Sequence, residues 1–212
     1  MLVGLYGGTF DPVHLGHTHA ALQVREALGL DEVRMVLAAR PGHRNAPAGN
    51  TEHRWHMLCI ACEQHEGLQA DDMELHRAGT SYTIDTVAAV RDASKGVLPC
   101  WILGQDAFAT LPSWYRWQSL LDFCNLIVVE RPGDTRAEPP EVQSLCHNHE
   151  VERFDDARIG QIYRLRVPMK EISATQIRLK IAAGEEVKHL LAPPVYAYIR
   201  RHRLYVNTEN AI

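Results

Sequence analysis

The segment from Met1 to His17 constrains the fold of this chain most. An apolar run from Leu2 to Tyr6 is typical of a buried strand, and it passes through Gly7-Gly8-Thr9-Phe10-Asp11-Pro12 into a helical pattern. This order predicts a strand, a tight turn and a helix N-terminus in direct succession. Glycines let the backbone approach a ligand without a Cβ in the way, and free N–H groups at a helix start carry roughly half a positive charge. We therefore predict that the turn binds a polyphosphate.

Two histidines stand at the mouth of this predicted helix. His14 and His17 are three residues apart, so both imidazoles can point to one side if the helix begins near Leu15. Gly16 then leaves room for a phosphate beside them. The alternative is a chance grouping in a loop, because the chain has 12 histidines. We favour a binding site, since the strand, the turn and the helix start coincide with the histidines.

The rest of the chain alternates short apolar runs with helical stretches. Strands are predicted over or within 33–38, 68–75, 98–103, 126–129 and 163–167, and helices over 17–28, 51–64 with Thr51 as its cap, 83–93, 114–123, 172–183 and from 193 onward. This order predicts an α/β fold, Rossmann-like and doubly wound, with a mainly parallel sheet and helices on both faces. Ligands of such folds bind beyond the carboxyl ends of the strands.

Two other regions have metal-like or irregular composition. The Pro- and charge-rich segment 132–156 is the least predictable part of the chain, a candidate flap whose conformation the sequence leaves open. We interpret Cys146-His147-Asn148-His149, which has no partner motif, as surface loop. Cys59-x-x-Cys62 lies in a helical pattern without a second cysteine pair, which favours core packing over zinc or redox chemistry. An odd number of cysteines, 5, at irregular spacing indicates reduced thiols.

Charge and length limit the classes of protein. A formal net charge of −4 argues against a nonspecific nucleic-acid binder and favours a small nucleotide as ligand. No apolar run approaches the roughly 18 residues of a membrane span, and the chain opens on a strand pattern rather than a signal peptide. We expect a cytoplasmic protein that binds no membrane. With 212 residues and 46% apolar content, one domain is expected, as monomer or oligomer.

Two ordered motifs resemble the nucleotidyltransferase superfamily and, within it, the bacterial nicotinate mononucleotide adenylyltransferases. The first is the Gly7-to-His17 segment, and the second is Ile172-Ser173-Ala174-Thr175-Gln176-Ile177-Arg178. The second motif departs from many members of the family at Ala174, where they have Ser. The resemblance implies one nucleotidyltransferase domain over 1–212, in which about 168–212 forms a C-terminal helical part.

The resemblance also implies an activity, the transfer of the adenylyl group of ATP to nicotinate mononucleotide. Its products are deamido-NAD and pyrophosphate, and Mg²⁺ is carried mainly by the ATP phosphates without dedicated protein ligands. Catalytic roles are implied for His14, His17 and Arg178. ATP-binding roles are implied for Gly7, Gly8, Thr9, Phe10, Gly104, Asp106, Arg131, Ser173 and Thr175.

Three further segments, 79–86, 112–117 and 41–44, resemble the acceptor site of the same family. The resemblance implies that the pyridine ring stacks on Trp114 and that N–H groups at Thr83 and Tyr115 receive the nicotinate carboxylate. The implied acceptor-binding residues are Arg44, Tyr82, Thr83, Trp114 and Tyr115. The 41–44 segment has Gly42 where the family commonly has a second proline. Trp114 and Trp117 have helical spacing, which we interpret as a core role for Trp117.

Two alternatives remain beside this hypothesis. The chain could be another adenylyl- or cytidylyltransferase of the superfamily, with phosphopantetheine or nicotinamide mononucleotide as acceptor. It could also be a noncatalytic sensor that keeps the fold and binds ATP. Turnover and acceptor preference distinguish the three.

Overall fold

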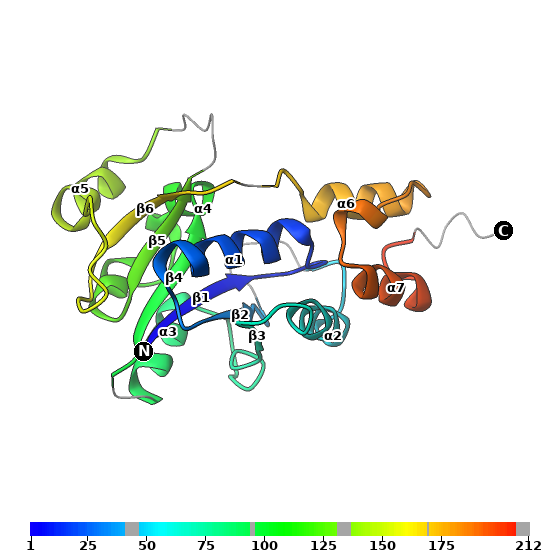
Figure 1. The fold of residues 1–212 in the computed structure, drawn as a ribbon, viewed down its shortest axis with the longest axis horizontal. Coiled ribbons are helices and arrows are strands. Elements are labelled where there is room, and N and C mark those ends of the chain that lie inside the picture. The colour runs from blue at the N-terminus through cyan, green and yellow to red at the C-terminus, as the bar shows by residue number, and fades with distance from the viewer. Residues whose placement is uncertain (41–46, 94–95, 131–136, 169, 207–212) are drawn as a thin grey trace.

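One six-stranded sheet organises the chain, which we describe from a computed structural model covering residues 1–40, 47–93, 96–130, 137–168 and 170–206 (Figure 1). The strands lie in the order β3-β2-β1-β4-β5-β6. Their bounds are β1 Leu2–Gly8, β2 Glu32–Leu37, β3 Leu68–Asp71, β4 Leu98–Gly104, β5 Asn125–Glu130 and β6 Ile162–Arg166. Every neighbouring pair is parallel. The predicted α/β fold class is confirmed, and the strand order reverses between β1 and β4.

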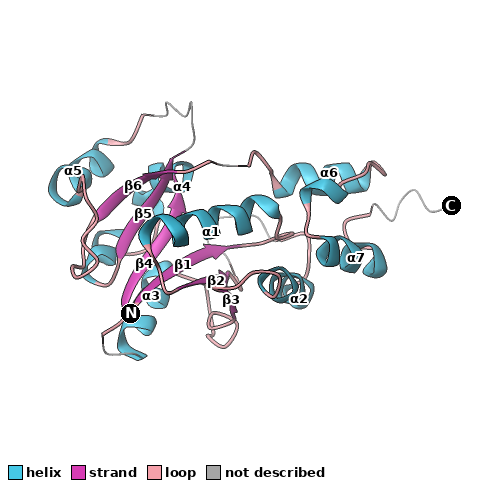
Figure 2. Ribbon diagram, viewed as in Figure 1, coloured by secondary structure: helices cyan, strands magenta, loops and turns pink. Residues whose placement is uncertain are grey.

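Helices cover both faces of the sheet and divide the core in two (Figure 2). On one face, α1 (Leu15–Leu28), α2 (Thr51–Cys62), α6 (Ala174–Ala182) and α7 (Pro193–His202) contribute to a first core. On the other, α3 (Thr83–Ala93), α4 (Gln105–Ala109), the 3-10 helices η1 (Leu111–Ser113) and η2 (Trp117–Asp122), and α5 (Pro140–His149) contribute to a second. A further 3-10 turn, η3 (Lys188–Leu190), precedes α7. Burial on both faces explains why β4 and β5 read as nearly continuous apolar runs.

Helix ends differ from the sequence prediction in two places. Helix α1 begins at Leu15 rather than His17 and ends at Gly29, whose φ of 61° is the left-handed conformation favoured by glycine. Helix α2 is capped by Asn50, whose side chain accepts from the His53 N–H at 2.8 Å. The expected cap, Thr51, is instead the first helical residue, because Asn50 already satisfies the terminal N–H groups.

The conformation of 132–156, which the sequence leaves open, is partly helical in the residues that the structure describes. Helix α5 lies within this segment, and Val142 is fully buried in the second core. Cys146 to His149 is therefore helical, rather than the surface loop that we predicted. Val142, Leu145 and Cys146 have helical spacing and pack against the second core, but they span little more than one turn, which is too short to stand out among charged and proline residues.

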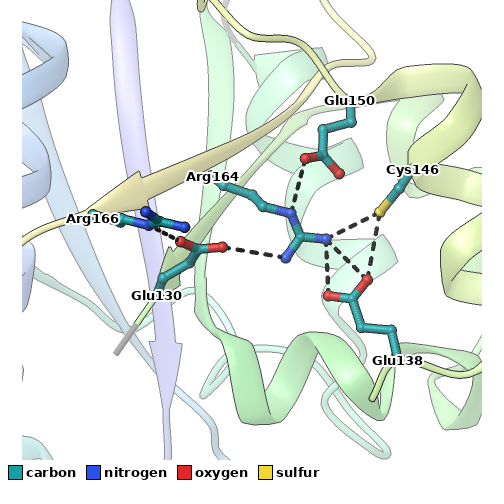
Figure 3. Close-up of polar contacts among 6 residues, drawn as sticks. All are labelled: Glu130, Glu138, Cys146, Glu150, Arg164 and Arg166. Carbon is teal, nitrogen blue, oxygen red and sulfur yellow. Dashed lines mark hydrogen bonds and ion pairs between the residues drawn. The ribbon is translucent and has the colours of Figure 1, made fainter. Parts of the chain in front are cut away.

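Ion pairs from β6 hold both ends of α5 (Figure 3). Arg164 donates through Nε to Glu150 at 3.0 Å and through Nη2 to Glu138 at 3.0 Å, and these two glutamates flank the helix. Its guanidinium also lies 3.7 Å from Glu130 at the end of β5. The two carboxylates that accept hydrogen bonds from Arg164 raise the pKa of its guanidinium. Long-range ion pairs of this kind fix α5 against the sheet edge.

The cysteines are thiols with packing roles. All five are free, and Cys62 is buried in the first core at the end of α2. Burial raises the pKa of the Cys62 thiol to about 12, so it stays protonated at neutral pH. Core packing of this cysteine, as predicted, is confirmed.

Among the described residues, we find no helix with the length and apolar character needed to cross a membrane.

Candidate active site

The turn between β1 and α1 is built around a buried phenylalanine. Phe10 has a φ of 47°, a left-handed conformation that is uncommon for a bulky residue, and its side chain is only 2% exposed. Its ring meets His17 edge-on, with centroids 5.1 Å apart and planes at 87°. The Phe10 ring is enclosed and packs against the His17 imidazole, which it helps to orient. Only the backbone of Phe10 is therefore placed to meet a ligand.

The two histidines lie together at the start of α1, as their spacing predicts. Their rings stack with centroids 3.6 Å apart and an interplanar angle of 20°. The backbone N–H of His14 donates to Nδ1 of His17 at 3.2 Å. An imidazole that accepts at Nδ1 carries its hydrogen on Nε2 when neutral. This hydrogen bond therefore selects the tautomer in which His17 donates through Nε2.

The glycines of the turn have packing requirements of their own. A Cβ on Gly7 would lie 2.5 Å from the Trp101 ring, and one on Gly8 would lie 2.8 Å from the Phe10 ring. A Cβ on Gly16 would lie 3.0 Å from Nδ1 of His14. The missing side chain at Gly16 thus leaves room for the His14 ring. Close packing at these positions explains the glycines without a ligand.

The second motif reaches the first across the length of the sequence. Arg178, on α6, donates through Nη1 to the backbone oxygen of Asp11 at 2.7 Å and through Nη2 to Oγ1 of Thr175 at 3.3 Å. Ser173 is the N-cap residue of α6, but its side chain makes no capping hydrogen bond. Its hydroxyl and that of Thr175 lie on exposed residues. The N-termini of α1 and α6 are therefore brought to one place.

Arg54, on α2, is a residue that sequence reasoning missed. It is 1% exposed, and its guanidinium donates to the backbone oxygens of Thr9 at 2.8 Å and Ala38 at 3.0 Å. It also donates to Oγ1 of Thr51 at 3.2 Å. Burial lowers the pKa of Arg54, and the negative charge of Asp11 opposes that effect. Arg54 thereby ties the ends of β1 and β2 together beneath the turn. The sequence did contain a signal for this residue: an arginine stands at a core-facing position of an amphipathic helix, and arginine is almost never fully buried unless it is paired.

The carboxyl end of β4 lies beside that of β1, since the two strands pair. Gly104 is the N-cap of α4, and a Cβ there would lie 2.6 Å from Oδ1 of Asp106. Glycine thus lets the Asp106 carboxylate lie against the start of α4. Arg131, which follows β5, and Arg44 are outside the described residues.

Part of the predicted acceptor group converges on the other side of the sheet. The Tyr82 and Tyr115 rings lie 4.4 Å apart at 33°, and Thr83 is the first residue of α3. Trp114 has an extended backbone, with φ −83° and ψ 143°, and Arg116 is left-handed with a φ of 51°. The expected helical stretch over 114–123 is confirmed only in part, as the 3-10 helix η2 over Trp117–Asp122, and the helical spacing of Trp114 with Trp117 is wrong because Trp114 lies outside that helix. Both indoles pack partly buried against the second core.

Arg40, the last described residue before the 41–46 gap, is anchored near this group. Arg40 donates through Nη1 to the backbone oxygens of Arg77 at 3.0 Å and Gly79 at 3.3 Å. The Ser81 N–H donates to the Arg40 oxygen at 3.0 Å. Arg40 therefore lies directly beside the segment that leads into Tyr82 and Thr83. Residues 41–44, which we predicted to border the acceptor, are outside the described residues.

The fold and the site together define the class of protein. A profile of the cytidylyltransferase-like family matches residues 5–180, so this chain is a member of that nucleotidyltransferase class. It is 39% identical over 206 residues to a protein of Aeromonas hydrophila named "Probable nicotinate-nucleotide adenylyltransferase", with 96% of each chain covered. A Hydrogenovibrio crunogenus protein of the same name is 37% identical over 204 residues, covering 96% of this chain and 97% of its own. The chain belongs to the nicotinate-nucleotide adenylyltransferase family.

Solved structures share the fold of this chain. The nicotinic acid mononucleotide adenylyltransferase of Plasmodium falciparum, complexed with NaAD, superposes with a TM-score of 0.75 at 18% identity, covering 96% of this chain and 97% of its own. The same Plasmodium protein complexed with APC gives a TM-score of 0.73 at 18% identity, with 96% of each chain covered. At this identity the likeness concerns the fold.

Proposed function

We propose that this protein transfers the adenylyl group of ATP to nicotinate mononucleotide, giving deamido-NAD and pyrophosphate in NAD biosynthesis. The observation that carries the proposal is the contact between Arg178 and the Asp11 backbone oxygen at 2.7 Å. It unites two helix N-termini, a histidine pair and an arginine, which together suit a triphosphate. The family relatives carry the name of this activity.

The reaction needs no covalent intermediate on the protein. A phosphate oxygen of the mononucleotide attacks the α-phosphorus of ATP in line, the bond to the β-phosphate oxygen breaks, and pyrophosphate leaves. His17 donates through Nε2 to the α-phosphate as charge develops there, and His14 supports it from the stacked position. Arg178, Ser173 and Thr175 hold the β- and γ-phosphates. Positioning and charge stabilisation supply the rate enhancement.

The remaining ATP contacts follow from the ends of the neighbouring strands. The backbone of Gly7, Gly8, Thr9 and Phe10 borders the phosphates. Gly104 and Asp106 border the ribose, where a carboxylate can accept from hydroxyl groups. We assign Arg131 to the edge of the adenine on the family resemblance.

The chemistry of the site suits a Mg²⁺ ion that arrives with ATP. In the described parts of the chain, no group of three or more His, Cys, Asp or Glu side chains is arranged to hold a metal. The Asp11 carboxylate already accepts from two backbone N–H groups and one hydroxyl. Phosphate and water oxygens would therefore be the main ligands of the ion, which neutralises phosphate charge.

The acceptor would bind between the start of α3 and the segment after η1. Trp114 offers an aromatic face to the electron-poor pyridine ring, and the close pair Tyr82 and Tyr115 extends this wall. N–H groups at Thr83 and Tyr115 would receive the nicotinate carboxylate, which is favourable at a helix N-terminus. Arg44 would meet the mononucleotide phosphate.

Pyrophosphate release with matched acceptors tests the function. We expect turnover with nicotinate mononucleotide at least about tenfold above that with nicotinamide mononucleotide, because N–H donors bind a carboxylate more strongly than a neutral amide. Equal turnover would contradict the acceptor assignment. Preference for phosphopantetheine would indicate another transferase, and ATP binding without turnover would indicate a sensor.

Replacing Trp114 by Ala should chiefly weaken acceptor binding. Loss of a stacked ring is expected to raise KM for nicotinate mononucleotide about tenfold or more, with KM for ATP little changed. Steady-state kinetics with each substrate varied in turn provides the measurement. Trp114→Phe keeps an aromatic face and serves as the matched control, expected within about threefold of wild type. An unchanged acceptor KM in Trp114→Ala would reject the stacking role.

We also propose that the chain acts as one domain in the cytoplasm. Helices α6 and α7, in the C-terminal part, share the first core with the sheet through Ile177, Val195 and Ile199. Five free thiols suit a reducing compartment.

A further inference from the structure

The Asp11 carboxylate joins three distant segments beneath the proposed ATP site. Asp11 is 4% exposed. Its Oδ2 accepts from the Ala48 N–H at 2.8 Å, and its Oδ1 accepts from the Gly49 N–H at 3.0 Å. Oδ1 also accepts from the hydroxyl of Tyr205 at 2.7 Å. Every one of these donors is neutral, although the acceptor is a buried charge.

Tyr205 reaches Asp11 because the chain turns back after α7. Arg203, the C-cap of α7, has a φ of 50°, and Tyr205 has a φ of 64°. The Leu204 N–H donates to the Ile199 oxygen at 3.1 Å, which closes the turn against the helix. Such left-handed conformations are uncommon for residues with a Cβ. Burial and the neighbouring Asp11 charge raise the pKa of Tyr205, so its hydroxyl remains a donor at neutral pH.

The fit around this hydrogen bond is close. A Cβ on Gly49 would lie 2.7 Å from Oδ1 of Asp11 and 2.9 Å from the Tyr205 hydroxyl. The loop before α2, the turn and the last described segment of the chain are therefore in direct contact. Displacing the tyrosine hydroxyl would leave Oδ1 with a single donor.

Arg178 stands next to this carboxylate without pairing closely with it. Its Nη1 is 3.8 Å from Oδ2 of Asp11, whereas the same nitrogen is 2.7 Å from the Asp11 backbone oxygen. A charged carboxylate that lacks donors attracts a guanidinium into a close bidentate pair. Here neutral donors occupy both carboxylate oxygens, and Arg178 stays at the backbone, 29% exposed as a side chain. The arginine is thus held where a phosphate can reach it.

We infer that Tyr205 is a positioning residue for ATP: its hydroxyl satisfies Asp11 and so keeps Arg178 available to the triphosphate. This inference rests on the proposed ATP site. Without the hydroxyl, Asp11 draws Arg178 into a closer ion pair, and ATP must break that pair in order to bind. The cost falls on ATP binding and leaves the acceptor site unaffected.

Tyr205→Phe tests the inference, with Tyr198→Phe as the matched control. The Tyr198 hydroxyl lies 2.9 Å from Nδ1 of His53, so the control also removes one tyrosine hydrogen bond between the C-terminal part and the rest of the chain. Tyr205→Phe should raise KM for ATP about tenfold, with kcat and the acceptor KM within about twofold of wild type. Tyr198→Phe should leave all three near wild type. Calorimetric titration with a non-hydrolysable ATP analogue should show the same loss of affinity.

A second background separates this role from simple destabilisation. In Asp11→Asn the residue at position 11 is neutral and no longer attracts Arg178, so adding Tyr205→Phe should raise KM for ATP less than twofold. An equal increase in both backgrounds would overturn the inference. So would a Tyr205→Phe enzyme with reduced thermal stability and kcat but unchanged KM for ATP. Failure of the proposed function is a different result, because the unmodified protein would then release no pyrophosphate.

Discussion

His17→Ala should lower kcat for pyrophosphate release by about three orders of magnitude, with the fold intact. The Nε2 donor acts on charge that develops at the α-phosphate, and loss of one such donor costs about a hundred- to a thousandfold in related charge-stabilising sites. The second part of the loss arises because the His14 ring stacks on His17 at 3.6 Å and loses its support. Single-turnover kinetics at saturating ATP and acceptor measures the chemical step directly.

The control for this variant is His56→Ala. His56 is an exposed histidine on α2, and its Nδ1 lies 2.9 Å from the Glu52 backbone oxygen. It has no role in the turn between β1 and α1. We expect its kcat to match wild type. Circular dichroism of both variants should be unchanged. Near-normal turnover in His17→Ala would contradict the mechanism that we propose for the histidine pair.

Arg54→Met should destabilise the protein by about 3 kcal/mol and abolish most activity. The guanidinium donates to the backbone oxygens of Thr9 and Ala38 and to the Thr51 hydroxyl, and a methionine of similar length removes these donors from the partly buried backbone oxygens of Thr9 and Ala38. Each unsatisfied buried acceptor costs about 1–3 kcal/mol, and relaxation recovers part of the total. Urea denaturation should show a lower midpoint, and pyrophosphate release should fall because the turn loses its support.

The comparison for Arg54 is Arg201→Met on the exposed side of α7. Replacing an exposed arginine changes stability by about 0.5 kcal/mol or less. ATP should partly restore the stability of Arg54→Met only if the turn can still form. A midpoint equal to that of wild type would show that the buried hydrogen bonds of Arg54 contribute no net stability.

The sequence predicted the strands and most helices because their signals are local. The apolar run of β4 and the period of α3 are present in the residues themselves, and the structure has Thr83–Ala93 helical as predicted. Helix α5 escaped prediction because its apolar period covers little more than one turn, and the ion pairs that hold its ends come from Arg164 on a distant strand. The break at Trp114 depends on the left-handed Arg116, which no propensity reveals.

The candidate site follows the same division between local and distant effects. The two histidines and the Ser173 motif were recognisable, since each is a short run at a helix start. The supports beneath them were not, because Arg54 and Tyr205 reach the turn from α2 and from the segment after α7. Their roles depend on which residues surround one buried carboxylate, and that is set by the complete fold. The packing of the His14 ring against Gly16 was hidden from the sequence for a related reason, since it depends on the rotamer that the fold gives His14.

The strand order has a consequence for how ligand and stability are linked. Strands β3, β2 and β1 form one half of the sheet and β4, β5 and β6 the other, and the chain then returns through α6 to the first half. In the ATP site that we propose, a triphosphate held by α1 and α6 would act as a reversible cross-link between the beginning and the end of the polypeptide. The melting temperature should therefore rise with ATP concentration. Binding of the nucleotide would then protect both ends of the chain from local unfolding at once.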